Sequence, residues 1–333
     1  KMKFVTYNLY EDAPQPRFGF IKENYIIDVV RASIWIKKNK DNSSFIKIPS
    51  ELKIALEKWE ENFRLLKDLN DQLPPQIPNS FLETTKPIAT TLDDACLLPP
   101  IMRPQSFRDF YAFEQHVRSA RKLRGLEMHP DWYKIPIFYF SNPSALYGHK
   151  QIVPYPKETK ELDFELEFAI IIAEGGSNIK QYEASKYIAG YTICNDWSAR
   201  DIQAWEYQPL GPFLSKSFGT SISPWIITPE ALEPFKRNPP ERKLPLLPHF
   251  EDDKAFVFDI NLVVKLIDHA GSETDISETN SKELYYSPVQ QVIHHASAGC
   301  GISTGDLMGS GTISGKEKGS FGCMLELSWG GKD

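Results

Sequence analysis

The stretch FELEFAIIIA, residues 164–173, decides the fold of this chain. Its second half is an unbroken run of mostly β-branched apolar residues, which is typical of a buried strand. Segments 187–195 and 256–267 are also short, β-branched and partly alternating, and only short helices are expected nearby, at 198–206 and 288–298. Because strands dominate without regular strand–helix alternation, the sequence predicts a mainly β (α+β) protein rather than a doubly wound sheet.

The first part of the chain has a different composition. Gly19 is the only glycine before Gly125, and KFVTY, GFIKE and YIIDVV within residues 3–30 predict short strands with a tight turn between the last two. Apolar residues recur at helical spacing over 50–70, which predicts one helix.

Two proline-rich segments, 73–81 and 97–104, indicate a linker between domains. We therefore expect a small N-terminal β domain over 1–95 and a larger domain over 96–333. This agrees with a length of 333 residues, which suggests about two domains at roughly 150 residues each.

Composition excludes several classes of protein. The net charge of −6 provides no basic surface for nucleic acid, and no apolar run is long enough to span a membrane. The four cysteines form no C-x-x-C pair, which argues against a disulfide scaffold and fits a reducing compartment. The start, KMKFVTYN, has no secretory signal pattern, so a cytoplasmic protein is expected.

Glu165 and Glu167 are the sharpest local sign of chemistry. Residues i and i+2 of a strand share one face, about 6.6 Å apart, so both carboxylates can reach one ion. In isolation such a pair is more often a solvated surface. Next to a buried strand, however, two carboxylates need a cation to offset repulsion and desolvation, and an all-oxygen site favours Mg²⁺, Mn²⁺ or Ca²⁺.

A second set of polar residues lies in the segment 194–219. Asp196 ends a predicted strand just before a helix, so it can point out of the sheet end as a further ligand. Arg200, Gln203 and Tyr207 then follow at i, i+3 and i+7 on one helical face. A polar face of this kind suits recognition of a carboxylate and a carbonyl.

The segments NDWSARDIQAWEYQPLGPFLSKSFGTSISPW (195–225), LDFELEF (162–168), SGTISG (310–315), DFYAFEQH (109–116) and MLELSW (324–329) resemble the signature of the fumarylacetoacetate hydrolase family. The resemblance runs from about residue 96 to the end. It implies a mixed β-roll in the C-terminal domain and a homodimer. Relatives continue through a further strand pair after the position of Asp333, so we expect the sequence to be part of a longer chain.

The resemblance also implies a role for individual residues. The implied divalent-metal ligands are Asp109, Glu165, Glu167 and Asp196, with Mg²⁺ as the expected cation and Ca²⁺ or Mn²⁺ as alternatives. His116 and Glu326 match a pair that activates water, and Arg200, Gln203 and Lys216 match groups that polarise the substrate and stabilise developing negative charge. The implied substrate contacts are Tyr111, Tyr139, Tyr207 and Thr312, and the implied second cation site involves Lys216 and Thr220. Residues 138–148 and the loop after His116 depart from the animal enzymes, so a substrate role is not carried over to Arg124.

The expected function is metal-dependent hydrolysis of a C–C bond in a β-diketo acid, either fumarylacetoacetate or another acylpyruvate. Such a step belongs to the catabolism of tyrosine or other aromatic compounds. Two alternatives stay open: a decarboxylase or isomerase of a 2-oxo acid from the same superfamily, and a catalytically silent metal-binding protein. Retention of both His116 and Glu326 favours hydrolysis, because decarboxylation does not require a group that activates water.

Overall fold

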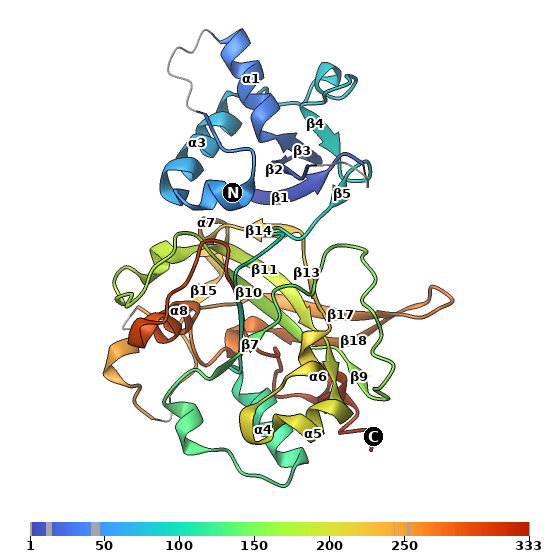
Figure 1. Ribbon diagram of the computed structural model, residues 1–333, viewed down its shortest axis with the longest axis vertical. Helices are drawn as coiled ribbons and strands as arrows, with labels where there is room; N and C mark the ends of the chain where they lie inside the picture. The colour runs from blue at the N-terminus through green and yellow to red at the C-terminus, as the bar shows by residue number, and fades with distance from the viewer. Residues whose placement is uncertain (1, 11–14, 41–46, 243, 252–253, 333) are drawn as a thin grey trace.

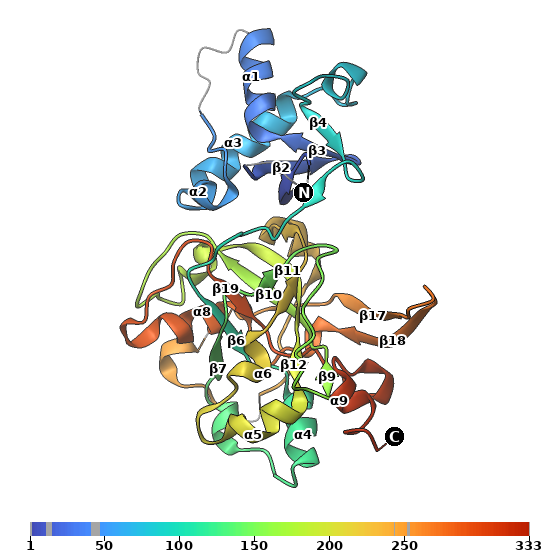
Figure 2. The same ribbon diagram turned by 45° about the vertical axis from the view of Figure 1, so that its right-hand side comes forward.

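The computed structural model describes residues 2–10, 15–40, 47–242, 244–251 and 254–332, and it shows helices arranged around a large mixed sheet (Figures 1 and 2). In these ranges the sheet has 13 strands. Its main path runs in the order β4 (Ala89–Thr91), β3 (Tyr25–Asp28), β2 (Arg17–Lys22), β1 (Lys3–Asn8), β14 (Trp225–Ile227), β11 (Ile188–Asp196), β10 (Leu166–Ile172), β19 (Leu307–Gly309), β6 (Phe107–Phe110) and β7 (Phe138–Ser141). The attached strands are β5 (Cys96–Leu97) on β1, β13 (Thr220–Ile222) on β11 and β8 (Leu146–Tyr147) on β13. Pairing is antiparallel except for β6 with β19 and β8 with β13, so the predicted mainly β architecture is confirmed.

Three two-stranded sheets and a set of helices complete the fold. The small sheets are β9 (Leu162–Asp163) with β12 (Ser198–Ala199), β15 (Lys236–Arg237) with β16 (Val257–Phe258), and β17 (Asn261–Ile267) with β18 (Glu273–Asn280). The α-helices are α1 (Val29–Asn39), α2 (Leu52–Leu56), α3 (Trp59–Gln72), α4 (Glu114–Leu123), α5 (Arg200–Leu210), α6 (Leu214–Ser217), α7 (Pro229–Leu232), α8 (Pro288–Ala296) and α9 (Met324–Leu327). Short 3-10 helices cover Asn79–Phe81, Pro130–Tyr133, Ala184–Tyr187, Glu233–Phe235, Pro248–Phe250, Ser281–Glu283, Ser297–Gly299 and Lys318–Ser320.

The central strand β10 is buried on both faces, which explains its unbroken apolar sequence. Phe168, Ile170 and Ile172 enter one hydrophobic core, whereas Ala169 and Ile171 enter a second core on the opposite face. The strands predicted around 164–173 and 187–195 are confirmed. The strand predicted over 256–267 is broken into β16 and β17, which belong to different small sheets.

The N-terminal part is more helical than its sequence pattern predicted. YIIDVV is not one strand: Asp28 accepts a hydrogen bond from the backbone N–H of Arg31 (2.9 Å), which caps α1 and turns Val29 and Val30 into a helix. The single helix predicted over 50–70 is divided into α2 and α3. Strand β1 pairs with β14, so the sheet runs continuously from the N-terminal strands into the rest of the molecule (Figure 1). The division at 95/96 stays a prediction.

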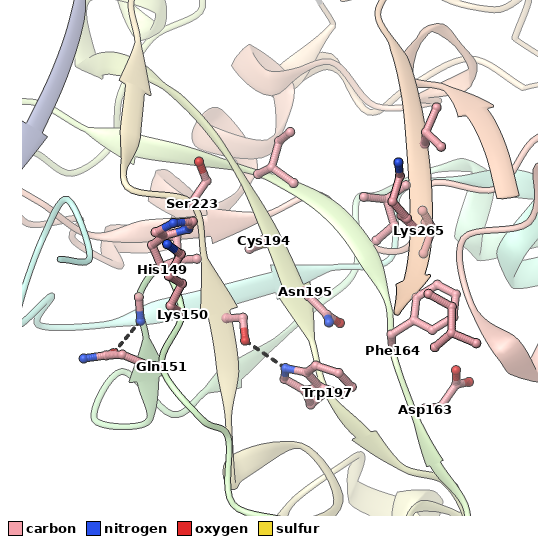
Figure 3. A pocket seen from close by; sticks show the side chains of 18 of the residues that line it. His149, Lys150, Gln151, Asp163, Phe164, Cys194, Asn195, Trp197, Ser223 and Lys265 are labelled. Carbon is pink, nitrogen blue, oxygen red and sulfur yellow. Dashed lines mark hydrogen bonds between the residues drawn. The ribbon is translucent and has the colours of Figure 1, made fainter. Parts of the chain in front are cut away.

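The hairpin of β17 and β18 projects from the body of the molecule (Figures 1 and 2). Beside it lies a hollow of about 720 Å³, lined by the hairpin, by β11 and β13 and by the segment 148–151 (Figure 3). We call this hollow the hairpin groove. Its lining is largely apolar and includes Ile193, Trp197, Trp225 and Val263.

Two further sequence expectations bear on the class of protein. Among the described residues, no helix is both long and apolar enough to cross a bilayer. Cys96, Cys194, Cys300 and Cys323 are all free thiols in the structure.

Candidate functional site

Three strands carry four acidic side chains to one edge of the main sheet. Asp109 lies near the end of β6, Glu165 directly precedes β10, Glu167 is its second residue, and Asp196 ends β11. β10 and β11 are antiparallel, so the start of one meets the end of the other, and the backbone N–H of Asp196 donates to the carbonyl of Glu165 (3.1 Å). The sheet topology therefore brings together the four residues predicted as metal ligands.

A glycine allows the carboxylates of Asp109 and Glu167 to meet. Strand β19 lies between β6 and β10, and its Gly309 pairs with Asp109 on one side and with Ala169 on the other. A Cβ atom at position 309 would lie 2.7 Å from both Asp109 Oδ1 and Glu167 Oε2. Glycine is thus required here for space, because any side chain would push the two carboxylates out of place.

Asp109, Glu167 and Asp196 form a group that fits a divalent cation. Their carboxylate oxygens lie within 4.8 Å of one another, and all three residues are buried. Asp109 Oδ1 and Glu167 Oε1 are buried without a hydrogen-bond partner among the described residues. Buried carboxylates this close repel one another, and their oxygens are the ligands that hard cations such as Mg²⁺, Mn²⁺ and Ca²⁺ prefer.

The pKa values of this group reflect the same crowding. Burial, reinforced by the charges of Glu167 and Asp196, raises the pKa of Asp109 well above its ordinary value. Burial together with Asp196 and Glu165 does the same to the pKa of Glu167. A bound cation would offset the repulsion that raises both pKa values.

Glu165 is held by cationic side chains instead. Its Oε2 binds the ammonium of Lys216, and its Oε1 lies 2.8 Å from Arg200 Nη1. Lys216 Nζ also donates to Asp196 Oδ2 (2.7 Å) and so joins Glu165 to the carboxylate group. Burial alone would raise the pKa of Glu165, but the charges of Lys216, Arg200 and His116 outweigh it and the pKa lies below its ordinary value. A role of Glu165 as a fourth metal ligand stays a prediction.

Lys216 is a buried cation whose charge is stabilised by its neighbours. Burial alone would lower its pKa, but the carboxylates of Asp196 and Glu165 outweigh that effect and raise the pKa above its ordinary value. The ammonium is therefore charged at neutral pH. It lies where it can interact with negative charge that develops on a bound molecule.

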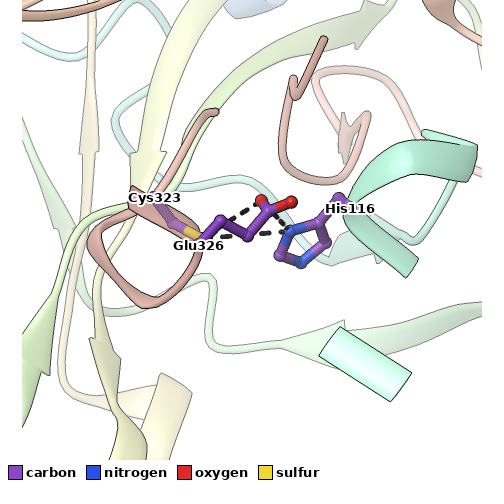
Figure 4. A group of neighbouring side chains, drawn as sticks. All are labelled: His116, Cys323 and Glu326. Atoms are coloured by element: carbon purple, nitrogen blue, oxygen red, sulfur yellow. Dashed lines mark hydrogen bonds and ion pairs between the residues drawn. The ribbon is translucent and has the colours of Figure 1, made fainter. Parts of the chain in front are cut away.

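His116 and Glu326 form the predicted pair (Figure 4). His116 on α4 places Nδ1 2.7 Å from Glu326 Oε2 on α9, and both residues are buried. A carboxylate only accepts, so Nδ1 carries the proton and Nε2 is left as the acceptor. Nε2 lies 3.9 Å from Glu165 Oε1, a separation that one water molecule can bridge. The His116–Glu326 pair thus lies next to Glu165, which Lys216 joins to the cluster of Asp109, Glu167 and Asp196.

A cavity of about 410 Å³ joins the two groups of residues. All of the predicted site residues line it except Asp196, Glu326 and Thr220. Asp196 and Glu326 contact the lining residues Lys216 and His116, and Thr220 contacts Asp196. Thr312 Oγ1 is buried and has no hydrogen-bond partner within the described part of the chain, so it can bind a molecule in this cavity. We call this space the central cavity.

The remaining predicted residues lie at different depths of this cavity. Tyr139 donates to Asp196 Oδ2 (2.6 Å), and its hydroxyl therefore belongs to the carboxylate group. The ring of Tyr111 packs edge-on against that of His116, with centroids 5.4 Å apart. Gln203 Oε1 accepts from Arg200 Nη1 (3.1 Å). Thr220 Oγ1 donates to the same Asp196 (3.2 Å), so the residues predicted for a second cation site contact the first group.

Two residues of the site were not predicted from the sequence. Arg124 lines the central cavity with its guanidinium over the ring of Tyr207, 4.1 Å from the centroid. Asp163 accepts from Arg200 Nε (2.8 Å) and from the backbone N–H groups of Met324 and Leu325 (2.7 and 3.0 Å). Asp163 belongs to the same acidic run as Glu165 and Glu167, and this run was the sequence pattern that could have predicted its place in the site. Arg124 carries no local pattern beyond its place near the end of a helix.

Comparison with known sequences gives consistent matches. The family model described as "Fumarylacetoacetate (FAA) hydrolase C-terminal" matches residues 105–326. The fumarylacetoacetase of Arabidopsis thaliana is 42% identical over 247 residues, which are 68% of this chain and 59% of that protein. The fumarylacetoacetase of Dictyostelium discoideum is 33% identical over 347 aligned positions, covering 95% of this chain and 80% of that protein. The chain thus spans less than two thirds of the Arabidopsis relative.

A solved structure shares the fold at low sequence identity. The maleylpyruvate hydrolase from Sphingobium sp. SYK-6, in complex with manganese(II) ion and pyruvate, superposes with a TM-score of 0.59 and 16% identity. The match covers 96% of this chain and 89% of that one. Nearly the whole described fold, including the N-terminal part, therefore has a counterpart in a known structure.

Proposed function

The chain belongs to the fumarylacetoacetate hydrolase family, and from this membership we propose that it hydrolyses a C–C bond of a β-diketo acid, with a divalent cation as cofactor. The family resemblance inferred from the sequence motifs is confirmed. The proposed substrate is fumarylacetoacetate or another acylpyruvate, and the step would belong to the catabolism of tyrosine or other aromatic compounds in the cytoplasm. The fumarylacetoacetases of Arabidopsis and Dictyostelium support this substrate class.

One observation carries the proposal. The free Nε2 of His116 lies 3.9 Å from Glu165 Oε1, so one water beside them could hydrogen-bond to both atoms, while Nδ1 is held by Glu326. His116 is thus a base with a fixed ring orientation, and it lies beside the three carboxylates that fit a cation. This arrangement can deliver activated water to a substrate bound by the cation.

Asp109, Glu167 and Asp196 would hold the cation, with Glu165 as the proposed fourth ligand. The Mn²⁺ named for the Sphingobium fold relative fits this donor set, and Mg²⁺ is our first choice. When bound, such a cation would hold and polarise the two carbonyl oxygens of a 1,3-dicarbonyl.

The residues of the chain would carry the protons. His116 Nε2 takes a proton from water, the hydroxyl oxygen bonds to the carbonyl carbon, and Glu326 stabilises the imidazolium. The C–C bond then breaks, its electron pair goes to the carbon of the leaving group, and the imidazolium returns the proton there. A methyl ketone and a carboxylic acid form, the acid loses its remaining proton to solvent to give the carboxylate, and one water molecule is consumed in each turnover.

The positively charged side chains around Glu165 would stabilise negative charge that develops on the reacting molecule. Lys216 and Arg200 line the central cavity and are both buried, so their charges act with little screening. Gln203, held by Arg200, would donate an amide hydrogen bond to a carbonyl oxygen. Arg124, stacked on Tyr207, suits the distal carboxylate of a dicarboxylic substrate.

The proposal is tested by incubating the protein with fumarylacetoacetate, acylpyruvates and oxaloacetate in ¹⁸O-labelled water with Mg²⁺ or Mn²⁺. We expect cleavage of a β-diketo acid with one ¹⁸O atom in the new carboxylate, because water supplies that oxygen. Protein treated with a chelator serves as the control and should be inactive. Release of CO₂ without ¹⁸O incorporation would instead support the decarboxylase, and cation binding without turnover would support the silent metal-binding protein.

We also propose that two copies of the chain associate through the hairpin groove. Val263, Leu266 and Ile267 of the projecting strand β17 are 50, 50 and 59% exposed. A two-stranded hairpin is only marginally stable on its own in water. A two-fold axis would let the hairpin of each copy cover the apolar groove of the other, which buries both surfaces.

Replacing Leu266 by aspartate is therefore expected to convert the dimer to a monomer, because a carboxylate would be desolvated in the contact. Sedimentation velocity over a range of concentrations measures the change. Ile34→Asp provides a matched control, since Ile34 on α1 is similarly exposed (48%) but does not line the groove. A wild-type protein that sediments as a monomer would refute the interface.

A further inference from the structure

The carboxylate of Glu326 receives more hydrogen bonds than the one from His116. Ser314 Oγ donates to Glu326 Oε2 at 2.5 Å. Cys323 Sγ lies 3.4 Å from the same oxygen (Figure 4). Ser314, Cys323 and Glu326 are each at most 1% exposed. Three donors therefore converge on one buried oxygen, Oε2, and water is excluded as a competitor.

The direction of the Ser314 hydroxyl is set by the backbone. The N–H of Gly322 donates to Ser314 Oγ (2.9 Å), which occupies an acceptor position of the hydroxyl. The hydrogen of the hydroxyl is then directed at Glu326. A Cβ at Gly322 would lie 2.5 Å from the carbonyl oxygen of Ile313, so the two segments approach as closely as they do because residue 322 is glycine.

Cys323 occupies a position where a side chain ordinarily caps a helix. It is the N-cap of α9, and Glu326 is the third residue of that helix. Serine or aspartate at an N-cap usually accepts from the first free backbone N–H groups. Here Asp163 accepts from the N–H groups of Met324 and Leu325 instead, so the thiol makes no capping bond and turns inward to Glu326.

We propose that Ser314 and Cys323 are positioning residues that hold the Glu326 carboxylate in the orientation in which it fixes the tautomer of His116. This inference rests on the proposed function for its effect on rate, but the hydrogen bonds it concerns exist in the free protein. Ser314 contributes most, since its hydroxyl is the stronger donor and the contact is shorter, whereas a thiol is a weak donor.

The charge of Glu326 agrees with this arrangement. Burial alone would raise its pKa, but the positive charge that His116 carries when protonated and the hydrogen bonds from His116 and Ser314 outweigh it, and the pKa lies below its ordinary value. The carboxylate therefore stays ionised at neutral pH and can stabilise a positive imidazolium.

The kinetic test compares Ser314→Ala, Cys323→Ala and Cys323→Ser with wild type. We expect Ser314→Ala to lower kcat about 10-fold with KM nearly unchanged, which is typical of losing a hydrogen bond to a charged group. Cys323→Ala should cost roughly threefold and Cys323→Ser should restore the rate, because a hydroxyl can still donate. Ser281→Ala, which removes a buried hydroxyl bonded to the carbonyl of Phe258 (2.6 Å), is the matched control for loss of a buried hydrogen bond.

A double-mutant cycle separates positioning from a structural effect. In a His116→Ala background the orientation of Glu326 no longer matters, so adding Ser314→Ala should cause no further loss of kcat. An equal 10-fold loss in both backgrounds, or full activity of Ser314→Ala, would overturn the inference.

A measurement without substrate keeps this inference distinguishable from the proposed function. In protein with ¹⁵N-labelled histidine, the Nδ1–H of His116, identified by its absence in His116→Ala, should give a downfield proton resonance. We expect this resonance to weaken or move upfield in Ser314→Ala and to persist in Cys323→Ser and Ser281→Ala. An unchanged resonance in Ser314→Ala would refute the positioning role even if the wild type cleaved no β-diketo acid. If Ser314→Ala does not fold, the comparison of Cys323→Ala with Cys323→Ser decides in the same way.

Discussion

Replacing His116 by alanine is expected to lower kcat roughly 10²- to 10⁴-fold, the usual contribution of a general base, with only a modest change in KM. The reason is that different residues of the central cavity would carry out proton transfer and substrate binding. In the proposed mechanism the imidazole moves the proton, whereas the bound cation and the side chains of Arg200, Gln203 and Lys216, which line the cavity, would bind the substrate without it. Steady-state kinetics with a β-diketo acid at saturating Mg²⁺ measures both constants.

Glu326→Gln should lose less than His116→Ala. A neutral amide still orients the ring through Nδ1, but it no longer stabilises the imidazolium. His129→Ala, which removes an exposed histidine that does not line the central cavity, is the matched control. Full activity of His116→Ala would remove the base from the mechanism and favour the decarboxylase alternative.

The second large effect is expected for Glu167→Gln, which should weaken cation binding on the order of 10²-fold and lower activity with it. Removing a residue that only hydrogen-bonds to a metal ligand typically lowers metal affinity 10- to 100-fold. Glu167 would contact the cation directly, so its loss should have at least this effect. Isothermal titration with Mn²⁺ gives the affinity without substrate. The cation should also raise the melting temperature of the wild type, and this rise should be lost in Glu167→Gln.

The same titration settles the role of Glu165. If Glu165 is a ligand, Glu165→Gln weakens cation binding as Glu167→Gln does; if it only holds Lys216 and Arg200, cation affinity is retained and kcat falls. The exposed Glu158→Gln is the control for loss of one acidic charge. Unchanged cation titrations in both the Glu165 and Glu167 variants would refute the assignment of the cation site.

The sequence predicted the elements whose patterns are local. The run 168–172 is apolar at every position because its strand is buried on both faces, and this alone indicates a buried strand. The i, i+2 spacing of Glu165 and Glu167 predicts one shared face. Where two local signals compete, the pattern misleads: Val29 and Val30 extend a strand-like sequence, yet the cap supplied by Asp28 makes them helical.

The sequence by itself determined a mainly β protein with an acidic pair on a buried strand. It could do so because burial and alternation produce patterns among residues that are neighbours in the chain. Only the tertiary structure decided which distant groups meet. His116 and Glu326 are 210 positions apart and meet through packing of α4 and α9, and Gly309 makes room for two carboxylates through the register of β19. The same holds for Glu165, which has the spacing of a ligand but is surrounded by Lys216 and Arg200 from other elements. Spacing along a strand defines the face of a side chain, whereas its charge partners depend on which elements pack against that face.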